Sequence, residues 1–193
     1  MTVQTLNARD QISVLNGPEI ALPDTSIIAQ IATQMRDAPD RAALAHGDIE
    51  MSYGDLWRAA SAVAGQLSAQ GVGPGALTPV LCRGGVALPV AAIGVMLAGA
   101  AFVPLDAAWP VERIRVALGK LAPKVVLYED GLPEALLKAT GETCLPINLD
   151  GLSTVEPLDA APDDLCYGFF TSGSTGVPKC CLNTHRGILN RFT

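Results

Sequence analysis

The densest group of chemically useful side chains lies in the stretch FFTSGSTGVPK, residues 169–179. Here two glycines, four hydroxyl groups and a lysine follow an apolar run, which is more than a simple turn requires. Glycine reaches backbone angles closed to other residues, so consecutive N–H groups can turn toward one anion. Hydroxyl groups add further donors, and a lysine adds a positive charge. The candidate anion-binding residues are Thr171, Ser172, Gly173, Ser174, Thr175, Gly176 and Lys179.

On local composition alone this stretch fits two structures, a phosphate loop and a polar turn. It is not a Walker A loop, because no pair of its glycines has the required spacing to Gly-Lys-Ser/Thr. A charge-assisted hydrogen bond contributes about 1.5–3 kcal/mol, so a few of them would hold a polyphosphate. A second glycine-rich stretch, GVGPGA at residues 71–76, follows a predicted helix and precedes a predicted strand. Dinucleotide-binding loops need the reverse order, so this stretch is interpreted as a connection.

Three stretches together resemble the adenylate-forming superfamily, whose members activate carboxylates with ATP. YGFFTSGSTGVPK resembles the phosphate-loop motif of that superfamily. MSYGDLWRAA, residues 51–60, resembles its first core motif, and MLAGAAFVPLDAAWPVERI, residues 96–114, is similar to its second. The form of the second motif, with NTHRGILNR after the loop, is most similar to adenylation domains of nonribosomal peptide synthetases. The resemblance extends from about residue 15 to the last residue.

The resemblance implies that a carboxylate and Mg-ATP form an acyl adenylate and pyrophosphate, after which a carrier-protein thiol accepts the acyl group. ATP and Mg²⁺ are therefore the expected cofactors. The loop from Thr171 to Lys179 would grip the β- and γ-phosphates, while the second motif would be a buried helix and strand. The family usually places Gly directly after the loop lysine. This chain has Cys180 there, a small side chain that the loop should tolerate.

The resemblance also implies that later motifs are missing. In the family these supply the substrate pocket, a ribose-binding aspartate, a magnesium-binding glutamate and the catalytic lysine of a C-terminal domain, and no residue here matches them. We therefore expect an incomplete domain without a catalytic residue or metal ligand, and an inactive isolated chain. A fragment of an acyl- or aryl-acid CoA ligase and a non-catalytic remnant serving as a binding module stay open as alternatives. The expected partners are the remainder of the adenylation domain, a carrier protein, an MbtH-like protein and, through exposed edges, a second copy.

Composition narrows the class of protein. Hydrophobic residues make up 49% of the 193 residues and charged residues 17%, which excludes disorder for most of the chain. The net charge of −6, without a large basic cluster, argues against nucleic acid as a partner. Five cysteines without CxxC spacing and a polar N-terminus predict reduced thiols and a cytoplasmic location.

Two further features of the sequence need an interpretation. Residues 84–105 carry no charge, but their Ala and Gly content, Pro89 and Pro104 favour a buried helix and strand over a membrane span. His46 and His185 have no second His, Cys or carboxylate at ligand spacing, so no metal site is expected there.

The elements that must position the loop follow an alternating pattern. From residue 77 onward strands alternate with helices, which predicts an α/β fold with a mostly parallel sheet and helices on both faces. We expect an N-terminal arm at residues 1–23 and the incomplete adenylation domain at residues 24–193. Earlier in the chain we expect a helix from Asp24, two short strands turned at Gly47 and a helix ended by Gly71. The predicted inner face of the first helix is Ile27, Ile31 and Met35, and that of the second is Leu56, Ala60, Val63 and Leu67.

Overall fold

A six-stranded sheet forms the centre of the molecule in the computed structural model, which describes residues 21–150, 155, 156, 158, 160–171 and 178–192. The strand order is β6-β5-β3-β4-β7-β8, and every neighbouring pair is parallel except β7–β8. The strands are β3 (Leu77–Cys82), β4 (Ala101–Asp106), β5 (Val126–Tyr128), β6 (Cys144–Pro146), β7 (Leu165–Thr171) and β8 (Lys179–Thr184). The predicted α/β fold with a mostly parallel sheet is confirmed, and the antiparallel strand β8 is an addition to the predicted order.

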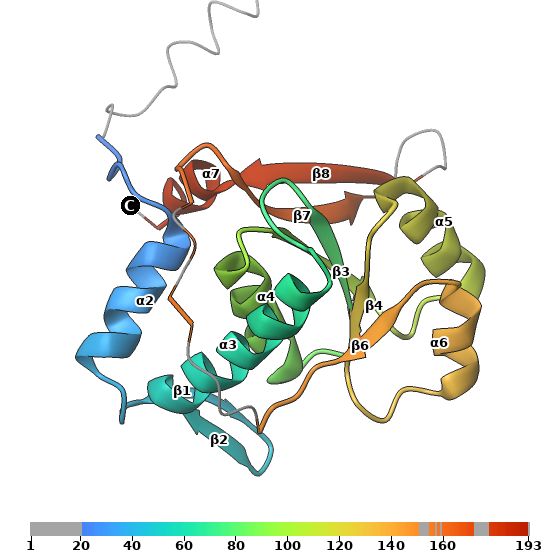
Figure 1. Cartoon of the computed structure of the whole chain (residues 1–193), viewed down its shortest axis with the longest axis horizontal. Helices are drawn as coiled ribbons and strands as arrows, with labels where there is room; N and C mark the ends of the chain where they lie inside the picture. The colour runs from blue at the N-terminus through green and yellow to red at the C-terminus, as the bar shows by residue number, and fades with distance from the viewer. Residues whose placement is uncertain (1–20, 151–154, 157, 159, 172–177, 193) are drawn as a thin grey trace, which may run out of the picture.

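The chain reverses its direction across the sheet at β3. It crosses from β3 through α4 (Ala87–Leu97) to β4, then back through α5 (Val111–Leu121) to β5 on the other side of β3 (Figure 1). Because crossovers between parallel strands are right-handed, opposite directions place the two helices on opposite faces. α6 (Glu134–Thr140) continues in the direction of α5 and lies beside it. Two buried clusters result, one around α4 and one around α5, which confirms the predicted helices on both faces.

α3 (Tyr53–Ala69) covers α4 from outside and follows the sequence pattern closely. It begins with a capping box in which the Ser52 hydroxyl accepts from the Asp55 N–H and an Asp55 carboxylate oxygen accepts from the Ser52 N–H, both at 3.1 Å. Gly71, at φ 69°, gives the left-handed residue that ends the helix, as predicted. The predicted inner face is confirmed because Leu56, Ala60, Val63 and Leu67 are all buried.

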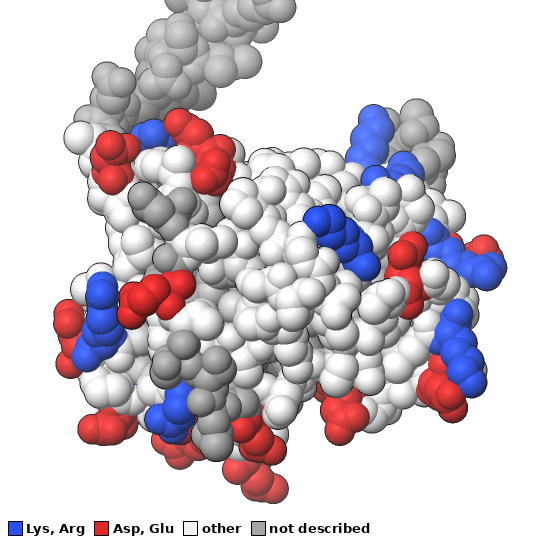
Figure 2. All heavy atoms as spheres, in the orientation of Figure 1, with Lys and Arg blue, Asp and Glu red and all other residues white. Residues whose placement is uncertain are grey.

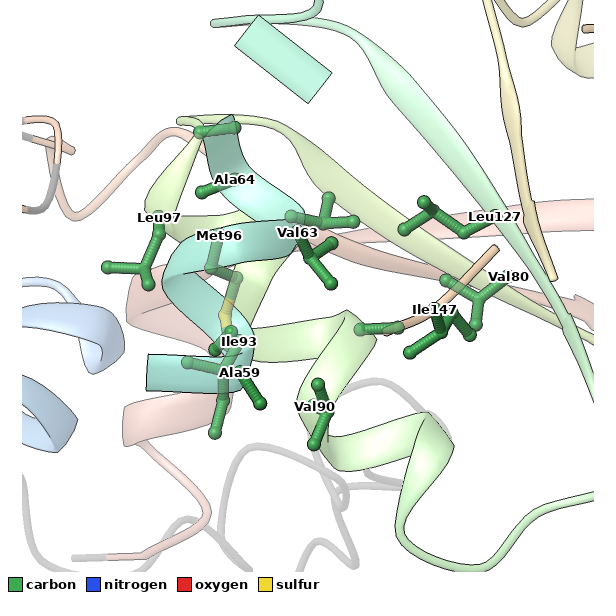
Figure 3. Close-up of a cluster of buried hydrophobic side chains, with 14 of the residues drawn as sticks. Ala59, Val63, Ala64, Val80, Val90, Ile93, Met96, Leu97, Leu127 and Ile147 are labelled. Carbon is green, nitrogen blue, oxygen red and sulfur yellow. The ribbon is translucent and has the colours of Figure 1, made fainter. Parts of the chain in front are cut away.

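α4 is buried almost all round, between α3 and the sheet (Figure 3). Figure 3 shows Ala59, Val63 and Ala64 of α3 packed with Val90, Ile93, Met96 and Leu97 of α4, beside Val80, Leu127 and Ile147. The uncharged residues 84–105 are therefore a buried helix followed by the buried strand β4, as predicted. None of the helices in the described part of the chain is long and apolar enough to span a membrane.

The first helix of the described region is α2 (Ile27–Asp37). Ser26 is its N-cap, and the Ser26 hydroxyl accepts from the Ala29 N–H at 3.3 Å. Its predicted inner face is partly wrong. Ile28 and Ala32 are buried together with Met35, while Ile27 and Ile31 are only partly buried. A four-residue spacing fits two neighbouring stripes of a helix equally well, and the tertiary packing of α2 selects between them. Of the predicted arm, residues 1–20 lie outside the described part of the chain.

Two short antiparallel strands, β1 (Ala42–His46) and β2 (Ile49–Ser52), form a hairpin below α3 in Figure 1. Gly47 occupies its turn at φ 58°, which confirms the predicted turn position. At the other end of the chain, α7 (His185–Leu189) directly follows β8. The Thr184 hydroxyl caps it by accepting from the Gly187 N–H at 3.1 Å.

Candidate functional site

The β7–β8 hairpin brings together the two ends of the predicted phosphate loop. Thr171 ends β7 and is paired with Lys179, the first residue of β8. The Thr171 hydroxyl donates to the Lys179 carbonyl oxygen at 3.4 Å, and both residues are exposed. The other predicted members, Ser172, Gly173, Ser174, Thr175 and Gly176, lie outside the described residues. The structure therefore places the two ends of the candidate site opposite each other.

The hairpin also determines at which edge of the sheet the candidate site lies. β7 runs parallel to β4, so its last residue belongs to the carboxyl edge, where open α/β sheets bind their ligands. The chain after the loop enters a strand and not a helix, so no helix N-terminus follows it directly. Anion binding at this position would therefore depend on backbone N–H groups, hydroxyls and Lys179 without a helix dipole.

An irregularity in β7 anchors the hairpin to the core. The pairing with β8 shifts between Leu165 and Tyr167, and both Cys166 and Tyr167 face the α4 side. The Cys166 thiol lies 3.5 Å from the sulfur of Met96 and is fully buried, and this burial raises its pKa to about 12. The Tyr167 ring stacks on Phe102 at a centroid distance of 5.9 Å. The part of β7 that precedes Thr171 is therefore well packed against the core.

Cys180 occupies the position where the resemblance leads one to expect glycine, and Gly168 makes room for it. A Cβ added at Gly168 would lie 2.9 Å from the Cys180 sulfur and 2.8 Å from Leu182 Cδ2, which is closer than such atoms come in proteins. Burial raises the pKa of the Cys180 thiol, with the neighbouring Cys181 as a smaller cause. Cys180 packs under the hairpin while Cys181 is exposed, and all five cysteines are free. The small side chain is thus packed away from the exposed Lys179.

One residue that contacts the loop end of the β7–β8 hairpin was not predicted from the sequence. Lys120, in the last turn of α5, donates from Nζ to the carbonyl oxygen of Pro178 at 2.6 Å. The two residues are 58 positions apart, so no local pattern could have paired them. Figure 2 shows Lys and Arg side chains at the upper right of the molecule, beside α5 and the loop end of the hairpin. No ion-pair partner lies within 4 Å of Lys120 or Lys179 among the residues that the structure describes.

A cavity of about 730 Å³ lies at the carboxyl ends of β3, β5 and β6. Arg83 and Glu129 border it, and the Arg83 N–H donates to a Glu129 carboxylate oxygen at 2.7 Å. His46 also lines it, packed against Gly85. None of the predicted site residues that the structure describes lines this cavity. Thr171 and Lys179, the described residues with anion-binding chemistry, lie at the end of the β7–β8 hairpin.

The two histidines have different environments. His46 is exposed, whereas His185 is 2% exposed and its Nδ1 has no hydrogen-bond partner among the residues that the structure describes. Burial lowers the pKa of His185, and Asp164 opposes that shift. The described residues contain no group of three or more His, Cys, Asp or Glu side chains suited to a metal ion.

Comparison of the sequence with known proteins identifies its family. Residues 31–193 match the family model described as AMP-binding enzyme. The nonribosomal peptide synthetase anaPS of Neosartorya fischeri is 37% identical over 77% of this chain and 6% of its own length. Tyrocidine synthase 3 of Brevibacillus parabrevis is 34% identical over 81% of the chain and 2% of its own length. Enterobactin synthase component F of Escherichia coli K12 is 31% identical, with shares of 94% and 14%. The chain thus spans a small part of the curated relatives it matches.

Solved structures give the same result. The AMPPNP-bound form of the nonribosomal peptide synthetase FmoA3 (S1046A) superposes with a TM-score of 0.84 at 29% identity, over 96% of this chain and 20% of that one. VinN, at 22% identity and a TM-score of 0.77 over 88% of this chain and 46% of that one, shares the fold. The family match covers the loop, its two flanking strands and α5. The chain belongs to the AMP-binding enzyme family, as the N-terminal part of a nonribosomal peptide synthetase adenylation domain.

Proposed function

We propose that this chain is the part of an adenylation domain that holds the β- and γ-phosphates of ATP while an amino acid is activated for transfer to a carrier-protein thiol. The observation that carries the proposal is the corner formed by Thr171 and Lys179, where a glycine- and hydroxyl-rich segment joins two paired strands. Both anaPS and FmoA3 are nonribosomal peptide synthetases, which favours an amino-acid substrate over the acids used by CoA ligases. AMPPNP, an ATP analogue, is bound in the FmoA3 structure, which supports ATP as the nucleotide.

In the reaction the substrate carboxylate attacks the α-phosphorus, the bond to the bridging oxygen breaks, and pyrophosphate leaves with the electron pair. Negative charge grows on the leaving group, so a fixed cation and aligned donors beside it lower the barrier. Lys179 would supply the cation and Thr171 a hydroxyl donor. This is positioning and charge stabilisation, without a covalent intermediate on the protein.

The residues present fit a polyphosphate better than they fit a metal ion. Lys179 is exposed and has no carboxylate within 4 Å in the described part of the chain, so its charge is available to an anion. The same part holds no cluster of metal-ligating side chains. Mg²⁺ bound with ATP would neutralise phosphate charge.

Two kinds of partner follow from this proposal. The remainder of the adenylation domain would complete the site, and a carrier protein would accept the activated acid. An MbtH-like protein is a further proposed partner. Self-association is proposed because β8 has one pairing partner in the described sheet, and because Phe169 of β7 and Leu182 of β8 are 49% and 43% exposed. Light scattering at high protein concentration should show dimers or larger species, and a monomer throughout would contradict that expectation.

Calorimetric titration with pyrophosphate and with ATP tests the phosphate-binding role. The unaltered chain should bind both ligands, and a double Lys179→Ala, Thr175→Ala variant should bind them at least about 10-fold more weakly, since a hydrogen bond to a charged group contributes about 1.5–3 kcal/mol. Lys138→Ala is a matched control, because Lys138 is an exposed lysine paired with Glu134 on α6. Equal heats for the unaltered chain and the double variant, or none for either, would refute the proposal.

A further inference from the structure

We propose that Lys120 of α5 is a positioning residue for the phosphate loop, holding the β8 side of the loop at Pro178 and thereby fixing the place of Lys179. The inference rests on the phosphate-binding function proposed above. It adds a residue that lies outside the loop in sequence and outside the motifs that identify the family.

The contact acts on the backbone of Lys179. The Lys120 ammonium donates to the Pro178 carbonyl oxygen at 2.6 Å, a short distance for a charged donor. That carbonyl and the N–H of Lys179 belong to the same peptide unit, which is planar. A restraint on the carbonyl therefore also restrains the direction of the Lys179 N–H and the start of its side chain.

A second side chain holds the other peptide unit of Lys179. The Thr171 hydroxyl donates to the Lys179 carbonyl oxygen at 3.4 Å, from the opposite strand of the hairpin. Pro178 itself has no N–H, so it cannot donate a hydrogen bond that would hold this strand at its start. Lys120 and Thr171 thus restrain the two peptide units on either side of Lys179.

The helix that carries Lys120 is well anchored. Ile114, Leu118 and Leu121 of α5 are buried in the cluster between this helix and the sheet. Groups held by a packed helix are positioned more accurately than groups held by another loop. Lys120 also adds a positive charge without a carboxylate within 4 Å in the described part of the chain, next to the place where a polyphosphate would bind.

Lys124 offers a matched control. It is also an exposed lysine that donates to the carbonyl of a distant residue, Gly71, but at the end of α3 instead of at the loop. Lys120→Met and Lys124→Met therefore remove the same charge and the same kind of bond at two different places. Lys120→Arg keeps a charged donor and should restore the behaviour of the unaltered chain.

The first measurement is amide hydrogen exchange at Lys179 and Cys180 without ligand. Lys120→Met should speed exchange at these amides about 2- to 5-fold, the range expected for loss of an exposed charged contact. Lys124→Met and Lys120→Arg should leave it unchanged. If exchange at Lys179 does not respond to Lys120→Met, the inference is wrong whatever the binding data show.

The second measurement is the dissociation constant for pyrophosphate. Lys120→Met should raise it about 2- to 5-fold, while Lys120→Arg and Lys124→Met should stay near the unaltered value. An equal rise in Lys124→Met would show a general charge effect and overturn the inference. If Lys179→Ala has no effect on binding, or the unaltered chain does not bind, the proposed function fails. In that case the exchange data alone decide whether Lys120 positions Lys179.

Discussion

At the residue scale, the chain contains a buried histidine that the proposed function does not use. His185 begins α7 and is 2% exposed, and its Nδ1 has no hydrogen-bond partner within the described part of the chain. Burial lowers its pKa, because the charged imidazolium loses its hydration in the folded protein. Asp164, whose carbonyl accepts from the His185 N–H, opposes this shift with its charge. The histidine is therefore expected to be neutral in the folded chain near pH 7.

This environment predicts a loss of stability in mild acid. Below the ordinary histidine pKa of about 6.5 the unfolded chain binds a proton that the folded chain resists, so the free energy of unfolding should fall as the pH drops below that value. The slope for one proton is at most about 1.4 kcal/mol per pH unit. Urea unfolding between pH 7.5 and 5 should show this slope, and His185→Gln should remove it.

His46→Gln is the matched control, because His46 is exposed. This substitution should leave the slope in place. Two carboxyls also have altered pKa values, Asp55 lowered mainly by Ser52 and Asp163 lowered mainly by Arg186. Both titrate below the histidine range, so they do not obscure the measurement. A slope that persists in His185→Gln would show that another group is responsible.

At the scale of elements, α3 and α4 approach each other closely at Gly94. A Cβ added at Gly94 of α4 would lie 2.7 Å from Val63 Cβ and 2.8 Å from the carbonyl oxygen of Ala60. The second contact is with backbone, which no rotamer change can relieve. Glycine at this position therefore sets how closely α3 and α4 pack, with α4 buried between α3 and the sheet.

Gly94→Ala should destabilise the chain by about 1–3 kcal/mol, because the helices must separate to admit one methyl group. Gly65→Ala is its control, since Gly65 lies in α3 with nothing within 4 Å of an added Cβ. That change should instead stabilise the chain by about 0.5–1 kcal/mol through helix propensity. The measurement is the urea midpoint of each variant, and equal midpoints for the two would contradict the packing argument.

At the scale of the whole molecule, our proposal assigns described residues to only one part of the adenylation reaction. The corner at Thr171 and Lys179 faces the leaving pyrophosphate in our proposal, while no described residue is assigned to the carboxylate, the α-phosphate or the metal. Aligning both reactants contributes roughly 7–11 kcal/mol in well-oriented reactions. The chain also spans only 2% to 14% of the curated relatives named above.

We therefore expect that the 193-residue chain by itself forms no acyl adenylate. Exchange of labelled pyrophosphate into ATP, run with the proteinogenic amino acids and common aryl acids, should stay at background. Exchange above background that disappears in a Lys179→Ala variant would show that these residues contain more of the site than we infer. Exchange that survives Lys179→Ala would point to a contaminating enzyme.

Much of this protein is determined by its sequence alone, because the responsible interactions are local. The capping box at Ser52 and Asp55, the turn at Gly47 and the end of α3 at Gly71 each depend on a few adjacent residues. The alternation of apolar strands and helices predicts the α/β sheet. The glycines and hydroxyls around Lys179 fit both a phosphate loop and a polar turn, and the family resemblance favours the loop. The turn at Gly47, the end of α3 at Gly71 and the mostly parallel sheet were predicted correctly. Residues 172–177 of the loop lie outside the described residues, and the role of the loop stays a proposal.

The remaining features depend on tertiary structure because they join residues far apart in the chain. The reversal at β3 depends on the handedness of the crossovers and on which faces of the sheet the helices can bury. The hydrophobic periodicity of the sequence contains neither piece of information. β8 is exposed along much of its length, so it has no clear strand pattern and forms by pairing with β7. The choice of Ile28 over Ile27 in α2 depends on its neighbours in space. The bond from Lys120 to Pro178 forms because the tertiary fold brings the end of α5 to the end of the hairpin.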